Sequence, residues 1–299
     1  PGHMGGVDSA RRTTELPRGV TFFAVAYGDP RFVLTGGEPM TRPDIVEIVD
    51  HSCGSVDETV LSTTGDMLLN GLRAEGVWQA LGRRPHASTV AVPLHAASAA
   101  VNSIVMPTLS GKQVERADVV AEVFRKAQSL GILATLRTTI TGLQTREDIL
   151  QIPEILKKRS VDLSKIRRKL YQYDPYVGPR SNADIVGKYS LTDQEFNEIS
   201  SNIADEFRDG FKDISYHPIC NSADNYVIVS PNGEVRVVES TEGNLPTEQY
   251  LCTDDGARLN ITEQPVKLMD EVTSMMPLQL WDPELVEDED LAELPHYRR

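Results

Sequence analysis

The sequence predicts an α/β fold, because short apolar strands alternate with amphipathic helices along most of its 299 residues. Composition agrees with this class: 40% hydrophobic and 25% charged residues suit one large domain, or a domain with an appendage. Runs of β-branched and aromatic residues also end repeatedly in turn residues. The expected strands, with their exit turns, are residues 20–25, 31–34, 59–65, 88–95, 132–140 and 168–175.

Segments with helical spacing separate these strands. Residues 43–49 and 119–127 have this spacing, and Gly131 ends the second segment. A further helix is expected over residues 148–158, interrupted near its start by Pro153. Such alternation predicts parallel strands, but it does not choose between a barrel and a doubly wound sheet.

The C-terminal third carries a helix and a hairpin. Thr192 and Glu195 form a capping box that opens a helix reaching about residue 207. Residues 226–230 and 234–238 flank a Pro-Asn-Gly turn, which predicts a β-hairpin.

Charge and cysteine content exclude several kinds of protein. A net charge of −14 and a pI near 4.9 argue against binding to nucleic acid or to anionic membranes. No apolar run is long enough for a membrane helix and no signal peptide opens the chain, so we expect a cytoplasmic protein. Three scattered cysteines do not make a disulfide framework. The basic run at residues 165–169 is expected to be a solvated charged face.

The most informative segment runs from Phe32 to Pro39 and reads Phe-Val-Leu-Thr-Gly-Gly-Glu-Pro. An apolar strand breaks here into two adjacent glycines, Gly36 and Gly37. Without Cβ atoms, these residues let a ligand approach the backbone closely. Pro39 then fixes φ and removes a donor after Glu38.

This segment resembles the second strand and following loop of the radical S-adenosylmethionine (radical SAM) superfamily. The resemblance implies a partial (β/α)6 TIM-like barrel with a C-terminal helix and hairpin extension. It also implies that Gly36, Gly37 and Glu38 hold the amino group of the methionine half of SAM. The expected parts are a tag remnant and N-terminal arm (1–17), the barrel core (18–190), a helix and hairpin closing the barrel (191–245) and an extension with an acidic tail (246–299).

The resemblance further implies an enzyme with SAM and a [4Fe–4S] cluster as cofactors. Members of this superfamily cleave SAM reductively to a 5′-deoxyadenosyl radical, which takes a hydrogen atom from the substrate. The implied partners are a small-molecule or peptide substrate and an electron donor such as flavodoxin or ferredoxin.

The chain departs from the family in its cysteines. The family holds its cluster with Cys-x-x-x-Cys-x-x-Cys after the first strand, but here the cysteines are Cys53, Cys220 and Cys252. Only five residues separate the strand expected at 20–25 from Arg31, too few for a parallel crossover. We therefore hypothesise that a cysteine-bearing segment is missing near residue 25, through disorder or deletion. An intact mass equal to 33.0 kDa would exclude the disordered version.

Several strand ends supply further site candidates. Ser62 and Thr64 are expected to contact SAM, although Thr64 stands where the family usually has Asn. His95 stands where a family strand ends in Asp, and we expect it to contact substrate or to deliver hydrogen. Strand alternation places Arg137 opposite Leu136, and its planar fork suits the SAM carboxylate or an acidic substrate.

The last expected strand ends in Gln172, Tyr173 and Asp174. In the family, the end of this strand often faces the adenosyl group or the substrate. Tyr173 and Asp174 are expected to contact substrate, or to deliver hydrogen or a proton. Two other functions stay open: a cluster-free α/β barrel enzyme acting on a phosphorylated small molecule, and a cluster-free binding protein with the radical SAM fold.

Overall fold

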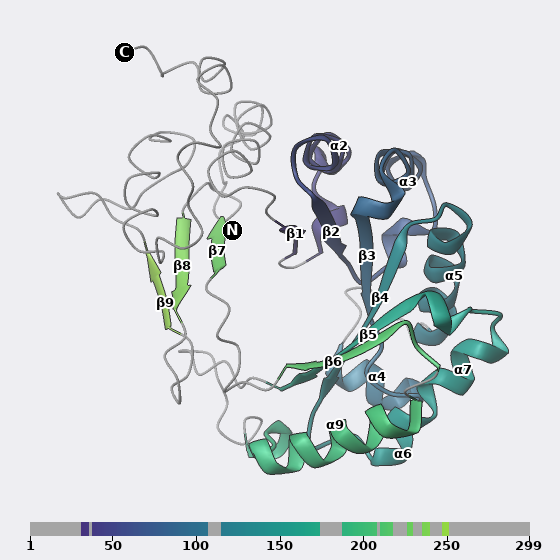
Figure 1. Cartoon of the computed structure of the whole chain (residues 1–299), viewed down its shortest axis with the longest axis vertical. Helices are drawn as coiled ribbons and strands as arrows, with labels where there is room; N and C mark the ends of the chain where they lie inside the picture. The colour runs from purple at the N-terminus through teal and green to yellow at the C-terminus, as the bar shows by residue number, and fades with distance from the viewer. Residues whose placement is uncertain are drawn as a thin grey trace, which may run out of the picture. The chain divides into compact units, whose positions relative to one another are not determined.

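The computed structural model describes residues 31–35, 38–106, 115–173, 187–207, 210–217, 226–229, 235–239 and 247–250. Its larger sheet has six strands that adjoin one another in chain order (Figure 1). The pairings β3–β4, β4–β5 and β5–β6 are parallel. The strands are β1 Arg31–Leu34, β2 Glu58–Ser62, β3 Ser88–Pro93, β4 Leu133–Ile140, β5 Ile166–Gln172 and β6 Asp213–His217.

The strand order decides between the two α/β architectures. In a doubly wound sheet the order reverses at a switch point, whereas in a barrel each strand adjoins the next. The order β1 to β6 has no reversal. The expected partial (β/α) barrel is therefore confirmed.

Helices follow most strands and cover one face of the curved sheet; α3, α5, α7 and α9 lie along its convex side (Figure 1). The α-helices are α2 Ile45–Ser55, α3 Leu72–Gly82, α4 Ala99–Val105, α5 Arg116–Ser129, α6 Arg146–Leu150, α7 Ile152–Lys158 and α9 Asp193–Phe207. Single 3-10 turns occupy Pro39–Thr41, Asp66–Leu68, Pro85–Ala87 and Leu163–Lys165. Of the helices in the described part of the chain, none is long and apolar enough to cross a membrane.

The two faces of the sheet differ in polarity. Along β4 the side chains of Leu136, Thr138 and Ile140 are fully buried, while those of Arg137 and Thr139 on the opposite face are half-buried. Ile140 belongs to a core that also contains residues of α6, β5 and α9: Ile149, Leu170, Phe196 and Ile203. Hence the apolar face meets the helices and the polar face is turned away from them.

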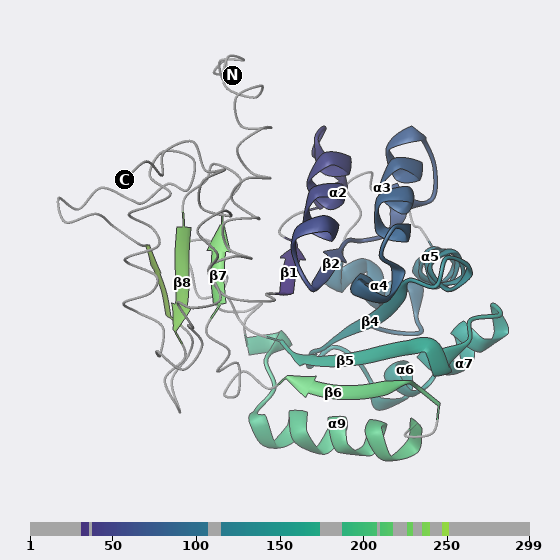
Figure 2. The same ribbon diagram turned by 45° about the horizontal axis from the view of Figure 1, so that its top comes forward.

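Helix α9 completes this core. Thr192 and Glu195 make the expected reciprocal capping bonds, with Thr192 N–H donating to Glu195 Oε2 over 2.8 Å and Glu195 N–H to Thr192 Oγ1 over 3.2 Å. The helix runs beside β5 and β6 (Figure 2) and buries Phe196 and Ile203. The capping prediction is confirmed.

The chain divides into two compact units, one formed by Val33–Ile45 and Val60–Ser222 and the other by Pro1–Phe32, Val46–Thr59 and Ala223–Arg299. In the second unit, β7 Tyr226–Val229 and β8 Val235–Glu239 pair antiparallel, as the expected hairpin requires. A third strand, β9 Thr247–Tyr250, pairs with β8. The proposed domain boundaries, and closure of the barrel by this hairpin, stay predictions.

Three features differ from the sequence-based expectations. Strand β6 was not predicted, because it is a five-residue edge strand with no buried residue. The helix expected over 148–158 is two helices, with Pro153 in the first turn of α7, where its missing N–H costs nothing. The basic run at 165–169 is not simply a solvated face: Arg168 is fully buried, its guanidinium 5.3 Å from the centre of the Phe211 ring.

The strand expected at residues 20–25 lies outside the described part of the chain.

Gly65, which follows the end of β2, should not tolerate a side chain. Its φ is +91°, and an added Cβ would lie 3.2 Å from Val92 Cγ1 and 3.3 Å from Val123 Cγ2. We expect Gly65→Ala to lower the free energy of unfolding by about 1–3 kcal/mol, measured by urea denaturation. Gly82→Ala is the matched control, because its added Cβ would contact nothing within 4 Å. Equal stability of the two variants would contradict this account.

Candidate functional site

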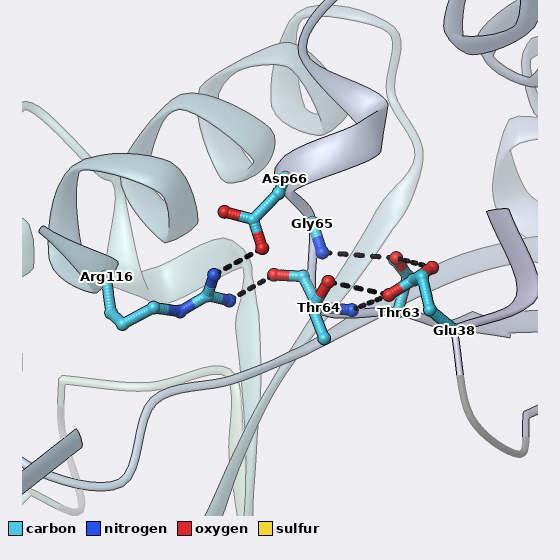
Figure 3. A network of polar contacts seen from close by, with 6 residues as sticks. All are labelled: Glu38, Thr63, Thr64, Gly65, Asp66 and Arg116. Carbon is cyan, nitrogen blue, oxygen red and sulfur yellow. Dashed lines mark hydrogen bonds and ion pairs between the residues drawn. The ribbon is translucent and has the colours of Figure 1, made fainter. Parts of the chain in front are cut away.

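The carboxylate of Glu38 joins the loop after β1 to the end of β2 (Figure 3). Oε1 accepts hydrogen bonds from Met40 N–H over 3.0 Å and from Thr63 Oγ1 over 2.6 Å. Oε2 accepts from Thr64 N–H over 2.7 Å and from Thr64 Oγ1 over 2.6 Å. Each carboxylate oxygen therefore faces one backbone N–H and one hydroxyl.

Local sequence explains why Glu38 lies here. Pro39 opens a 3-10 turn, and Glu38 caps that turn through the bond to Met40. The backbone oxygen of Glu38 accepts bonds from the N–H of Thr41 over 3.0 Å and from its hydroxyl over 2.7 Å. The Glu-Pro-x-Thr sequence thus fixes both the side chain and the backbone of Glu38.

Arg116 supports the same strand end from the helix side. This residue, the first of α5, is 2% exposed. Its guanidinium donates to Thr64 O, and to Asp66 Oδ2 over 2.5 Å (Figure 3). Arg116 and Asp66 were not predicted as site residues. One signal was available: a cation in the first turn of a helix opposes the helix dipole, so it needs another reason to be there.

Two predicted residues meet on the face of the sheet that carries Arg137 and Thr139, called the helix-free face because no helix of the described residues covers it. Arg137 Nη1 on β4 donates to Ser62 Oγ at the end of β2 over 2.5 Å. The side chain spans β3, where Pro93 pairs with Arg137. The guanidinium carbon lies 6.0 Å from the centre of the Tyr171 ring, and Arg137 Nε is buried without a hydrogen-bond partner. An arginine carries five N–H donors, so the Arg137 side chain keeps donors beyond the one that bonds Ser62.

His95 lies where β3 leaves the sheet, with 7% of its surface exposed. The backbone N–H of Thr139 donates to His95 Nδ1 over 3.1 Å. Asn102 Oδ1 accepts from the His95 N–H over 2.9 Å, and Gln144 Nε2 donates to the His95 carbonyl over 2.7 Å. The imidazole therefore satisfies a β4 donor; a substrate role for His95 stays a prediction.

These contacts set the protonation state of His95. A backbone N–H can only donate, so Nδ1 is the acceptor and the ring proton sits on Nε2. Burial, and next the positive charge of Arg116, lower the pKa of His95 from 6.5 to about 4. The ring is neutral at physiological pH.

The remaining predicted residues are dispersed. Tyr173 donates its N–H to Ile140 O over 3.0 Å and packs against the Tyr189 ring, with centroids 5.7 Å apart. Gln172 turns to the helix side and bonds Leu191 O and Asp193 Oδ1, each over 3.0 Å. Gly36, Gly37 and Asp174 lie outside the described residues.

A polar cluster on β5 and β6 was also missed. Tyr171 stacks on His217 with ring centroids 4.8 Å apart, and His217 Nε2 is 3.2 Å from Ser215 Oγ. Strand register places Lys169 beside Arg137 and Ser215 on the same face. Because β6 was not recognised, sequence reasoning could not bring these residues together.

The described residues do not fit an iron–sulfur cluster. Among them, no three Cys, His, Asp or Glu side chains group closely enough to hold a metal ion. Cys53 is buried in α2, and Cys220 and Cys252 lie outside the described residues. A [4Fe–4S] cluster needs several thiolates around one point, which this set does not supply.

Comparison with known proteins supports the resemblance. No family model matches the chain. A 75-residue stretch is 35% identical to an AdoMet-dependent heme synthase from Methanosarcina barkeri (strain Fusaro / DSM 804) and covers 24% of this chain and 22% of that protein. The fold resembles that of Streptococcus suis SuiB, with a TM-score of 0.54 and 13% identity over 92% of this chain. The match to the heme synthase and the likeness in fold to SuiB together support a relationship to the radical SAM superfamily.

Each of the two similarities covers only part of the matched protein. At 13% identity, the likeness to SuiB shows the fold alone, and this chain spans 60% of the length of SuiB. The match to the heme synthase covers less than a quarter of either protein. The comparisons thus establish the fold of this chain, while its reaction and its substrate are matters for proposal.

Replacing the Glu38 carboxylate by an amide should break its network. In Glu38→Gln, either orientation of the amide turns NH₂ toward one backbone N–H, of Met40 or of Thr64. We expect a loss of about 1–3 kcal/mol in the free energy of unfolding, measured by urea denaturation. Glu154→Gln is the control, because the exposed pair of Glu154 with Lys157 contributes under about 1 kcal/mol. Similar losses in both variants would contradict the assigned network.

Acid should destabilise the protein partly through His95. Between pH 6.5 and about 4 the unfolded chain protonates this imidazole and the folded protein does not, so the free energy of unfolding falls as pH falls. Across this pH range, the free energy of unfolding should lose a contribution from His95 on the order of 3 kcal/mol. His95→Asn keeps an acceptor that can face Thr139 N–H but does not titrate, so its stability should depend less on pH in this window. Parallel pH profiles from urea denaturation would show that His95 titrates normally.

Proposed function

We propose that this chain binds SAM on the helix-free face, at the ends of β1, β2 and β3, beside Arg137 of β4. The observation that carries the proposal is Arg137, which spans β3 to reach Ser62 and keeps one buried donor without a partner. The family-type loop with Glu38 is tied to the same end of β2. Arg137, Ser62 and the Glu38 loop thus lie together near the carboxyl-terminal ends of the strands. Barrel enzymes bind their ligands at this end of the sheet.

The charges of SAM suit this arrangement. Its α-carboxylate matches the planar fork of Arg137, and Ser62 Oγ can donate a further hydrogen bond to it. The α-amino group is cationic and calls for acceptors; Gly36, Gly37 and Glu38 remain the predicted contacts for it. The carboxylate of Glu38 is already bonded to four donors, so the Glu38 backbone is the part we assign to this contact.

For the whole protein we propose a radical SAM enzyme acting on a small-molecule or peptide substrate, with flavodoxin or ferredoxin as electron donor. The [4Fe–4S] cluster of such enzymes supplies the electron for SAM cleavage. Because the described residues do not fit that cluster, the role proposed for them is confined to binding and orienting SAM. His95, Tyr173 and Asp174 remain the proposed contacts to substrate.

Titration calorimetry with two matched ligands tests the proposal. SAM carries the α-carboxylate, whereas 5′-methylthioadenosine has the nucleoside without it. Arg137→Met should weaken SAM binding about tenfold to a hundredfold, the cost of one charge-assisted contact, and leave 5′-methylthioadenosine binding unchanged. Arg146→Met is the control, because the Arg146 side chain is 58% exposed and pairs with Glu206 over 3.6 Å.

Two results would overturn the assignment. Unchanged SAM affinity in Arg137→Met would remove the carboxylate contact. Absence of SAM binding, together with stabilisation of the protein by inorganic phosphate, would favour the cluster-free barrel enzyme acting on a phosphorylated small molecule.

A further inference from the structure

Arg116 occupies an energetically unfavourable place unless it has a specific partner. It is the first residue of α5, where the helix dipole repels a cation. Its guanidinium is also almost completely removed from water. The two bonds to Thr64 O and Asp66 Oδ2 offset part of these costs, while Arg116 Nε is buried without a hydrogen-bond partner.

Thr64 connects Arg116 to Glu38 through hydrogen bonds. Arg116 holds the Thr64 carbonyl from the helix side, while Thr64 N–H and Oγ1 hold Glu38 Oε2 from the other side. The charged groups alternate along this chain of contacts from Asp66 through Arg116 to Glu38 (Figure 3). The donors to Glu38 in the described residues are neutral; the guanidinium behind Thr64 is paired with Asp66, and its bond to the Thr64 carbonyl polarises the peptide group of Thr64.

Gly65 and Thr63 limit how this strand end can rearrange. Gly65 has a left-handed conformation and fits closely against Val92 and Val123, and its N–H donates to Thr63 Oγ1 over 3.1 Å. The Thr63 hydroxyl in turn donates to Glu38 Oε1. A shift of Thr64 would therefore strain Gly65 and break two of the bonds to Glu38.

We propose that Arg116 is a positioning residue for the SAM site: it clamps the end of β2 against Glu38 and so fixes the loop backbone without touching the ligand. This inference rests on the proposed function for its ligand, but the clamp is a property of the protein alone. The buried position of Arg116 on the helix side separates its role from that of Arg137 on the helix-free face.

Hydrogen–deuterium exchange and SAM titration test the clamp together. Arg116→Gln should raise amide exchange at residues 38–41 and 63–66 by about tenfold or more and weaken SAM binding by a similar factor. Arg116→Lys keeps the charge but cannot hold Thr64 O and Asp66 with one planar fork, so intermediate values are expected. Arg125→Gln is the control on the same helix, since Arg125 is exposed and bonds only Arg159 O among the contacts described.

A double-mutant cycle separates positioning from general destabilisation. If Arg116 acts through Glu38, adding Arg116→Gln to Glu38→Gln should change exchange at residues 38–41 far less than Arg116→Gln does alone. Additive effects, or exchange that rises equally across the whole sheet, would overturn the proposal. Should Arg116→Gln fail to fold, the same cycle with Arg116→Lys decides.

The two proposals fail differently. If the wild type does not bind SAM, the proposed function fails, while the exchange cycle still shows whether Arg116 positions Glu38. If the wild type binds SAM and Arg116→Gln binds it equally well, only the positioning role fails.

Discussion

The hydrogen-bonded carboxylate of Glu38 is the interaction on which the candidate site depends. It joins the loop after β1 to the end of β2. Backbone hydrogen bonds of the sheet do not hold these two segments together, because both lie beyond the last strand residues. Two of its four donors are backbone N–H groups, which cannot turn away or accept a bond instead. Each carboxylate oxygen accepts two hydrogen bonds, so this partly buried anion fixes the positions of its donors. It thereby sets the backbone geometry at Met40 and Thr64.

The division of the sheet into two faces follows from a different constraint. Helices can cover only one face of a partial barrel, and that face is apolar: Leu136, Ile140 and Leu170 are fully buried against the helices. The other face keeps Arg137 and the stacked pair of Tyr171 and His217. Polar side chains are thereby concentrated on one face, where the charged ligand proposed for this site would compensate them.

The cysteines of this chain depart from the motif of the superfamily that its Gly-Gly-Glu-Pro loop resembles. The Gly-Gly-Glu-Pro loop, Ser62 and Arg137 are the residues for which contacts to SAM are proposed. Among the described residues no set of side chains fits a cluster, and Cys53 is buried in α2. The loop and the fold therefore carry the relationship to the radical SAM enzymes independently of the cluster motif.

The sequence by itself determined the alternation of strands and helices, the capping box at Thr192 and the family-type loop, because each depends on residues within one short segment. It also selected Ser62 and Arg137 individually, from strand ends and strand alternation. Only the tertiary structure decided that Arg137 reaches Ser62 across β3, that Arg116 clamps Thr64, and that His95 accepts a bond from Thr139. These contacts join residues 44 to 75 positions apart, so they depend on strand order and register. Likewise β6 forms because β5 offers a free edge with matching register, and five partly polar residues show no such tendency alone.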